Sequence, residues 1–274
     1  MSRKKKIIYL LSAVLTIIVI TGCGQQKSVE KTLDQTNAPL KVATNATFVP
    51  FEFKSEENGD FAGYEMDLIR AIGKKINRDV QIQDMAFNGL IPALQSGELD
   101  VAASGMAITK ERTDKVLFSS PFYETRLVIL AKKNSGIQSE ADLNTHRIAC
   151  QMGTIAADYI QQMGLKAKQF DHNADALMDL KVGGSDAVVA AKPVLDYFAA
   201  NNGKDDFVVI PIKDTPKQYV AFALNKQNTK LQKEIDEALA EMKKSGEFQQ
   251  IYEKWFGHEP DTLPVTTEEA LQAK

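Results

Sequence analysis

The chain has 274 residues, a formal net charge of −3 at pH 7 and only two cysteines. An acidic balance argues against a nucleic-acid partner, whose phosphates need a basic patch, and two cysteines provide no disulfide framework. The three histidines, His146, His172 and His258, have no metal-ligand spacing. No phosphate-binding glycine loop, nucleophile elbow or catalytic triad is recognisable. We therefore expect no metal, no cofactor, no nucleic acid and no enzyme activity.

The first 22 residues have the pattern of a signal peptide. Basic residues at 3–6 precede a fourteen-residue apolar run at 7–20, which is shorter than the roughly 20 residues of a spanning helix. The letters ITGC that follow resemble the lipobox of bacterial lipoproteins. The pattern predicts cleavage after residue 22, palmitate-type lipid attachment at Cys23 and an extracytoplasmic protein anchored to the cell membrane. The alternative is an uncleaved membrane anchor with a chance cysteine.

Residues 23–38 are polar and predict a flexible tether. After Leu40, strands alternate with helices, which indicates α/β architecture with mostly parallel sheets. The first set comprises strands at 40–45, 80–85 and 100–105 and helices at 64–76 and 89–97. A further strand at 127–131 precedes the second set, which comprises strands at 147–151, 167–170 and 186–191 and helices at 154–163, 174–182 and 193–201. The last strands are at 207–212 and 219–225, and two helices, at 228–244 and 247–256, close the fold.

Two sets of elements predict two lobes. Lobe 1 comprises residues 39–125 and 218–257, lobe 2 comprises residues 126–217, and 258–274 form a polar, loosely ordered tail. The chain crosses between the lobes near 123–126 and 217–219, and two such crossings form a natural hinge. Cys150 lies in an apolar strand and is expected to be a buried, inert thiol.

The stretch 100–123 is the first candidate for a binding site. A buried strand runs to Gly105, where backbone can approach a ligand, and Thr109 can cap a short helix that carries Arg112. Ligands of open α/β sheets bind at the carboxyl ends of strands. The alternative is a plain strand, turn and helix with a surface arginine.

Several motifs in this order carry a family resemblance. VATNATFVPFEFK, GYEMDL, FNGLIPALQSGELD and ITKERTDKVLFSSPFY, extended by QMGT, SDAVV, KPV and EKWFG, closely resemble the polar amino-acid solute-binding proteins of family 3. Over the first hundred residues the chain is most similar to the glutamine-binding proteins. The resemblance spans about 40–257 and implies a type II periplasmic-binding-protein clamshell, a monomer that closes on one ligand. It also implies a permease and an ATPase of an ABC importer as partners.

The resemblance assigns a role to each site residue. Arg112, with N–H groups at the start of a helix in the other lobe, would hold the ligand carboxylate, which suits a guanidinium and helix N-terminus. Two phenylalanines would sandwich the aliphatic part, and polar residues at strand ends would contact the remainder. The ligand-binding positions are Asn45, Phe48, Phe87, Ser104, Gly105, Arg112, Gln151, Thr154, Ile155 and Ala191.

Three positions depart from the family pattern. The aspartate that usually holds the ligand ammonium is replaced by Ala191, a hydroxyl residue by Ala107, and an acidic residue by Asn45. An ammonium in a closed cleft without a counter-charge costs several kcal/mol. Either another carboxylate supplies the charge or the ligand lacks a free ammonium, and a polar neutral or acidic ligand is favoured over arginine. The candidate carboxylates are Glu52, Glu124 and Asp158, whereas Asp186 is expected to be structural.

Two other functions are compatible with the same fold. Relatives of the clamshell dehydrate cyclohexadienyl acids, which needs a general acid in the cleft; no matched position here holds a carboxylic acid or histidine. A sensory or adhesin lipoprotein would use the fold without transport. The sequence favours a binding protein that delivers a polar amino acid or close analogue to a permease.

Overall fold

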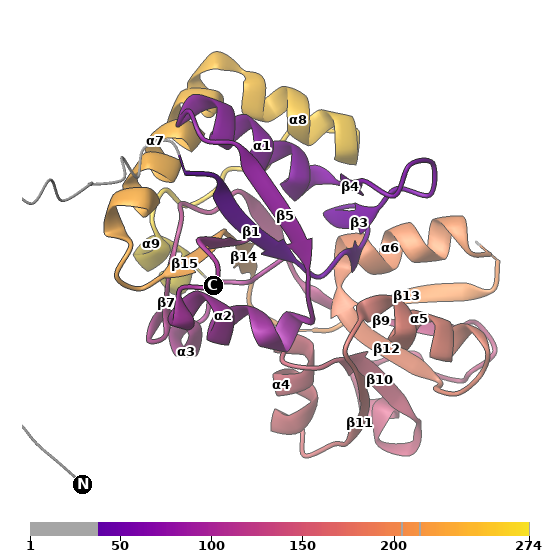
Figure 1. The fold of residues 1–274 in the computed structure, drawn as a ribbon. Helices are drawn as coiled ribbons and strands as arrows, with labels where there is room; N and C mark the ends of the chain where they lie inside the picture. The colour runs from indigo at the N-terminus through magenta and orange to yellow at the C-terminus, as the bar shows by residue number, and fades with distance from the viewer. Residues whose placement is uncertain (1–37, 204, 214, 274) are drawn as a thin grey trace, which may run out of the picture. The chain divides into compact units, whose positions relative to one another are not determined.

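The computed structural model describes residues 38–203, 205–213 and 215–273. Its fold is built on two five-stranded mixed sheets (Figure 1). Each sheet belongs to one lobe, and both lobes lie within one compact unit. The predicted two-lobed α/β architecture is confirmed. The predictions for the signal peptide, for Cys23 and for all but the last residue of the tether lie outside the described residues.

The sheet of lobe 1 has the order β5-β1-β6-β15-β7. β1 pairs in parallel with β5 and β6, whereas β15 is antiparallel to β6 and β7. Side chains alternate between the two faces, as a strand requires: Leu40 and Val42 belong to one core cluster and Ala43 to the other. The strands are β1 (Leu40–Thr44), β5 (Val80–Asp84), β6 (Val101–Ala102), β7 (Val116–Phe118) and β15 (Ala223–Asn225).

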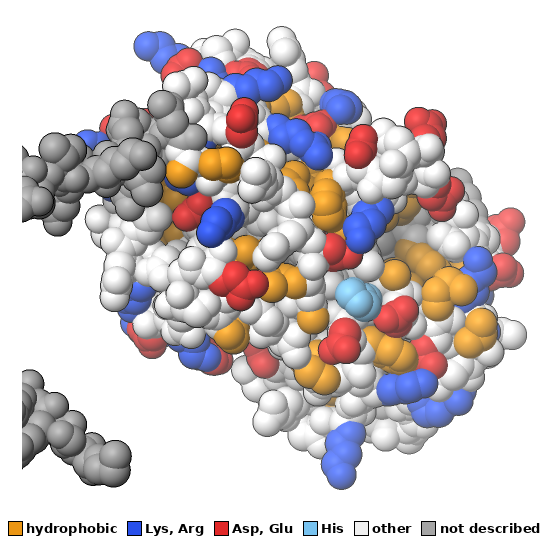
Figure 2. Space-filling model, in the orientation of Figure 1, with side chains coloured by type: hydrophobic (Ala, Val, Ile, Leu, Met, Phe, Trp, Pro, Cys, Tyr) orange, Lys and Arg blue, Asp and Glu red, His pale blue; other side chains and the backbone are white. Residues whose placement is uncertain are grey.

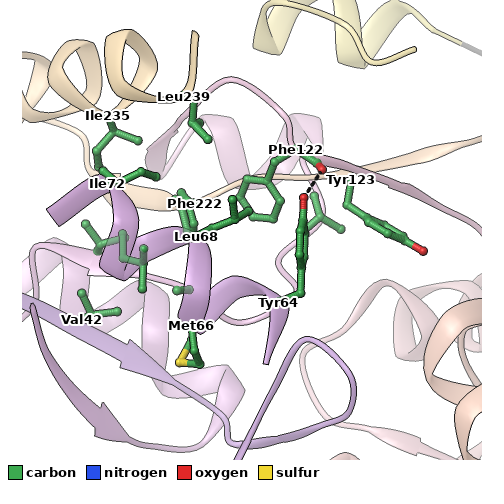
Figure 3. Packing of buried hydrophobic residues seen from close by; sticks show 14 of the residues in the cluster. Val42, Tyr64, Met66, Leu68, Ile72, Phe122, Tyr123, Phe222, Ile235 and Leu239 are labelled. Carbon is green, nitrogen blue, oxygen red and sulfur yellow. Dashed lines mark hydrogen bonds between the residues drawn. The ribbon is translucent and has the colours of Figure 1, made fainter. Parts of the chain in front are cut away.

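Helices cover both faces of this sheet. On one face, α1 (Tyr64–Lys75), α7 (Thr229–Ser245) and α8 (Glu247–Phe256) pack together over an aromatic and aliphatic core. Figure 3 shows Tyr64 in this core, where its hydroxyl donates a 2.9 Å hydrogen bond to the carbonyl of Phe122. The other face is covered by α2 (Leu90–Ser96), preceded by the 3-10 helix η2 (Phe87–Gly89), and by the short α3 (Lys110–Thr113).

The sheet of lobe 2 has the order β11-β10-β12-β9-β13. β10 is parallel to both β11 and β12, and β9 is antiparallel to β12 and β13. One face packs against α4 and the other against α5 and α6. The elements are β9 (Leu127–Lys132), β10 (Ile148–Gln151), β11 (Ala167–Phe170), β12 (Ala187–Ala191), β13 (Phe207–Pro211), α4 (Ile155–Gln162), α5 (Asn173–Lys181) and α6 (Lys192–Asn201).

The two lobes are connected through a separate two-stranded sheet. β8 (Tyr123–Thr125) pairs in antiparallel register with β14 (Gln218–Val220). These are the two segments at which the sequence predicts that the chain crosses between the lobes. Closure needs changes in only a few backbone angles here.

Several short elements escaped the sequence patterns. They are the small sheet of β2 (Thr47–Phe48), β3 (Glu52–Lys54) and β4 (Phe61–Ala62), the edge strand β7 and the 3-10 helix η3 (Glu140–Thr145). A strand of two or three residues is too short to show an alternating pattern.

The prediction of a loosely ordered tail is wrong for its last part. Residues after the family core form α9 (Thr267–Gln272), which Thr266 caps by accepting a hydrogen bond from the N–H of Glu269. Ala270 is buried against the core of lobe 1, and Leu263 packs there too. A polar segment therefore docks through three apolar side chains, Leu263, Ala270 and Ala273, too few to produce a helical pattern in the sequence.

Candidate ligand-binding site

A cavity lies between the lobes, where strands β1, β6, β10 and β12 end. It holds about 640 Å³ of space free of protein atoms, a figure that includes the solvent at its mouth. All ten residues predicted to bind the ligand line this one cavity. The family resemblance predicted these positions, and the fold brings them together near the edge at which the parallel strands of each sheet end.

Arg112 is a nearly buried cation at the wall of this cavity, with 7% of its surface exposed. Its guanidinium donates to the carbonyl of Ala107 at 2.9 Å and, across the cleft, to the carbonyl of Gly153 at 3.0 Å. Burial lowers its pKa to about 10. No salt bridge connects Arg112 to an Asp or Glu of the described segments, and the adjacent Glu111 pairs with Lys115 instead. Because a guanidinium has five N–H donors, three remain for an anionic group.

The N-terminus of α4 faces the same cavity from lobe 2. Thr154 caps the helix by accepting from the N–H of Ala157, and its hydroxyl donates to the carbonyl of Gln151. The first N–H groups of a helix have no partner within the helix, and Thr154 and Ile155 both line the cavity. A carboxylate held by Arg112 would therefore meet donors from both lobes.

Gly105 forms the floor of the cavity in lobe 1. Its φ is +56°, and a Cβ atom there would lie 2.7 Å from the ring of Phe48, so only glycine fits. Its N–H donates a 2.7 Å hydrogen bond to Glu65. The backbone N–H of Gly105 is thus occupied by the protein itself.

Two buried carboxyl groups lie behind this floor. Glu52 lines the cavity, and both Glu52 and Glu65 are fully buried. Burial, and next the carboxyl of Glu65, raise the pKa of Glu52 well above its usual value; burial raises the pKa of Glu65 to about 8. Ser104 donates to Oε1 of Glu52 at 3.3 Å, while Oε2 has no hydrogen-bond partner among the described residues.

Asn45 connects the two lobes rather than presenting a free amide. Its Oδ1 accepts from Thr47 and from Gln151 of lobe 2, at 2.9 and 3.0 Å. Its Nδ2 donates to the carbonyl of Met85 at 3.0 Å and to Nδ1 of His172 in lobe 2 at 2.8 Å. We call Asn45, Gln151 and His172 the interlobe latch. Every hydrogen-bonding group of the Asn45 side chain is occupied, by the two other latch residues and by Thr47 and Met85.

The two phenylalanines of the predicted sandwich both line the cavity. Phe87 is buried and its ring lies 5.4 Å from the guanidinium carbon of Arg112, a cation–π contact. Phe48 is partly exposed and packs against Phe51. Phe87 therefore lies against the cation of the cavity, whereas Phe48 lies beside Gly105.

Of the three candidate carboxylates, only Glu52 lines the cavity. Glu52 is at the cavity wall, whereas Glu124 pairs with Lys217 in the hinge at 2.8 Å. Asp158 is not among the cavity-lining residues. Asp186 pairs with Arg147 at 2.6 Å, and hydrogen bonds from that arginine lower the pKa of Asp186 to about 2.

Ala191 and Ala107, which depart from the family pattern, both line the cavity. Cavity-lining residues that the sequence did not single out are Phe51, Thr125, Leu127, Ala156, Asn173, Val189, Ala190 and Val220. Asn173 is the polar residue among these that the fold buries completely, at 1% exposure. It begins α5, which passes close to β2. The only feature of the sequence that could have indicated Asn173 is its position at a helix start. Asparagine is common there as a capping residue, so the position alone does not indicate ligand binding.

Cys150 is a free, fully buried thiol, and burial raises its pKa to about 11. Within the described segments, three or more His, Cys, Asp or Glu side chains nowhere gather in a way that could hold a metal ion. Nor does any helix in those segments have the length and apolarity to cross a membrane. On the face drawn in Figure 2, acidic and basic side chains are interspersed rather than segregated.

Comparison with known proteins identifies the family. The model of the bacterial extracellular solute-binding proteins, family 3, matches residues 40–258. The arginine-binding extracellular protein ArtP of Bacillus subtilis (strain 168) is 32% identical over 257 residues, covering 92% of this chain and 98% of that protein.

Solved structures agree. An ancestral arginine-binding protein bound to glutamine has 39% identity and a TM-score of 0.76, covering 80% of this chain and 98% of its own. The ancestral amino-acid-binding protein AncCDT-1, a precursor of cyclohexadienyl dehydratase, has 35% identity and a TM-score of 0.73, covering 80% and 95%. The fold is thus that of the type II periplasmic binding proteins. The chain belongs to the family 3 bacterial extracellular solute-binding proteins, the polar amino-acid-binding proteins of ABC importers.

Proposed function

We propose that this protein is an extracytoplasmic lipoprotein that binds one amino-acid-type ligand between its lobes and delivers it to the permease of an ABC importer. The observation that carries the proposal is the guanidinium of Arg112, which is nearly buried at the cavity wall and forms no salt bridge in the described segments, where the charge of Asp158 acts on it only from beyond salt-bridge distance. A buried cation is costly unless it is paired. A ligand carboxylate between Arg112 and the start of α4 would supply the missing anion and join the two lobes.

Glu52 supplies the counter-charge for a cationic group of the ligand. Glu52 lines the same cavity as Arg112, and its buried Oε2 has no hydrogen-bond partner among the described residues, whereas Ala191 offers no charge. Opposite charges at one cavity suit a zwitterion, since an amino acid carries both. The sequence favoured a neutral or acidic ligand over arginine because the family's acidic residues are missing. Glu52 weakens that argument, and arginine is the ligand in the names of several relatives. The ligand is therefore an amino acid whose cation, α-ammonium or side chain, faces Glu52.

Calorimetric titration with the twenty amino acids tests the binding function. We expect at least one to bind, and Arg112→Ala to weaken it by about thirtyfold or more, because removing one member of a buried charge pair costs about 2–5 kcal/mol. Arg112→Lys keeps the charge but loses the planar fork, so it should recover only part of the affinity. If Arg112→Ala unfolds the unliganded protein, Arg112 is structural and the proposal fails at this residue.

The same titration with Glu52→Gln tests the counter-charge. Burial raises the pKa of Glu52 in the folded protein, and a cation bound beside it would favour the ionised carboxylate, so binding should release protons in the pH range where Glu52 titrates in the unliganded protein. Titrations in buffers of different ionisation enthalpy measure that release, which Glu52→Gln should abolish. L-Arginine, L-citrulline and desamino-arginine then show which cation is involved. Equal affinities of wild type and Glu52→Gln for every ligand would contradict the assignment.

Delivery to a permease and lipid anchoring have separate tests. Mass spectrometry of the mature protein should find a lipid on Cys23, and deletion of the gene should reduce uptake of the ligand that calorimetry identifies. Unchanged uptake would favour the sensory or adhesin function instead.

Glu52 also bears on the dehydratase alternative. It is a cavity-lining carboxyl with a raised pKa, which is the type of group a general acid needs, so the sequence argument that the cleft lacks an acid does not hold. We nevertheless expect no product when the protein is incubated with prephenate or arogenate. Product formation that Glu52→Gln abolishes would establish the enzyme function.

A further inference from the structure

Asn173 is the second cavity-lining residue that carries an unpartnered buried polar atom. Six side-chain nitrogen or oxygen atoms in the described segments are buried without a hydrogen-bond partner. Two of them belong to residues that line the ligand cavity, Oε2 of Glu52 and Nδ2 of Asn173. They come from different lobes, Glu52 from β3 and Asn173 from the start of α5.

The fold does not explain an asparagine at this position. Asparagine is a poor residue inside a helix and is useful at a helix start when its side chain caps the first N–H groups. The cap position of α5 is His172, however, and Asn173 makes no capping hydrogen bond. A buried amide without a partner destabilises the folded state. A hydrophobic residue of the same size would avoid this cost, so the amide has a use outside folding.

Asn173 lies next to the interlobe latch, which borders one end of the cavity. The preceding residue, His172, accepts a hydrogen bond from Asn45, and both amide hydrogens of Gln151 are taken by Asn45 and by the carbonyl of Asp171. The obvious polar groups here are therefore engaged with one another, and Asn173 retains a donor. Arg112 instead contacts Gly153, before α4.

We propose that Asn173 determines ligand specificity by donating a hydrogen bond from its amide to an oxygen atom of the ligand side chain. The proposal rests on the binding function proposed above. It extends that function by naming the chemical group of the ligand side chain that lobe 2 recognises. The Asn173 donor favours ligands whose side chain has a carbonyl oxygen, as in a carboxamide or ureido group. It disfavours a guanidinium side chain, which has donors only. Glu52 and Asn173 thus offer the ligand one acceptor and one donor from opposite lobes.

The test compares Asn173→Leu, which keeps the approximate shape but removes the amide, with the wild type. L-Glutamine and L-citrulline carry a side-chain oxygen, whereas L-arginine does not. We expect Asn173→Leu to weaken glutamine and citrulline binding by about tenfold or more and arginine binding by less than about threefold. Asn144→Leu is the matched control, because Asn144 is an exposed asparagine in the same lobe outside the cavity, and it should leave all three affinities unchanged.

The outcomes separate this proposal from the binding function. Equal losses for all three ligands, or no loss, overturn the role of Asn173 and leave the binding function intact. If the wild type binds none of the three, this inference fails, whereas the binding function fails only if none of the twenty amino acids binds. Should Asn173→Leu not fold, Asn173→Asp replaces it; an acceptor at this position should favour arginine over glutamine relative to wild type, and an unchanged preference overturns the proposal.

Discussion

Gly153 and Gly164 have the same backbone conformation but different surroundings. Both have a φ of +74°, yet a Cβ on Gly153 would lie 3.1 Å from the side chain of Asn88 across the cleft, whereas a Cβ on Gly164 would meet nothing within 4 Å. Gly153 therefore combines two requirements, a left-handed backbone and close approach of the other lobe. Only the second concerns the ligand.

We predict that Gly153→Ala weakens ligand binding while Gly164→Ala does not. Both substitutions should reduce the free energy of unfolding by about 1 kcal/mol, because a residue with a Cβ is strained in this conformation. In Gly153→Ala the added methyl group also obstructs closure. Urea unfolding and calorimetric titration measure the two effects, and equal affinities of the two variants would show that the lobes do not approach at Gly153.

Glu65 makes stability depend on pH in a direction opposite to that of most surface carboxyls. Folding raises its pKa from 4.5 to about 8, so the folded state binds more protons than the unfolded state between these values. The free energy of unfolding must then decrease as pH rises through this window.

We predict that Glu65→Gln makes this decrease shallower by at least about 1 kcal/mol between pH 5 and pH 8. Glutamine can still accept the hydrogen bond from Gly105 but does not titrate. Urea unfolding at the two pH values provides the measurement, with the exposed Glu57→Gln as control. A slope unchanged by Glu65→Gln would mean that Glu65 is ionised in the folded protein.

At the scale of elements, helix α9 extends the family fold at its C-terminal end. The family match ends at residue 258, and α9 adds Ala270, 7% exposed, to the core of lobe 1, while Leu271 beside it is 39% exposed. The segment is thus held by one face of a short helix.

We predict that Ala270→Asp destabilises the protein by about 2 kcal/mol, because it places a charge in an apolar contact. Leu271→Asp changes the exposed neighbour and should cost less than about 0.5 kcal/mol. Differential scanning calorimetry without ligand compares them. Similar melting temperatures for both variants would show that α9 does not dock in solution.

The longer elements could be predicted from the sequence because each carries its own periodic pattern. The alternation of β1 and the apolar face of α1 are local properties of a few successive residues. In contrast, β2 to β4 and β7 are short strands that form because a neighbouring strand offers a hydrogen-bonding edge. YVAFALN, predicted as a single strand, divides into β14 in the hinge and β15 in the sheet, since the two halves pair with different partners.

At the scale of the whole molecule, closure has two contributions. In the proposed function one comes from the ligand, through Arg112 and α4, and the other comes from the interlobe latch, whose hydrogen bonds need no ligand. The hydrogen bond from Asn45 to His172 joins residues 127 positions apart. Such a contact stabilises the closed form by roughly the value of one hydrogen bond, about 1 kcal/mol.

We predict that His172→Ala shifts the unliganded protein towards open forms, seen as a larger radius of gyration in small-angle X-ray scattering. Ligand affinity should fall by about three- to tenfold, since the lost contact must be replaced by binding energy. Saturating ligand should still close the variant. His258→Ala, at an exposed position, is the control, and the idea fails if both variants scatter like the wild type without ligand.

The sequence by itself determined the α/β class, the hinge segments and the set of strand ends that surround the cavity, because periodicity is local and parallel strands end at one edge. It also pointed to Arg112 and Gly105. The tertiary structure decided which polar groups remain free. The side-chain amide of Asn45 is occupied by hydrogen bonds with Met85, Gln151 and His172. Glu52 and Asn173, by contrast, each have a buried atom without a hydrogen-bond partner. Whether a buried group is satisfied depends on residues that are distant in the chain and meet only in the fold.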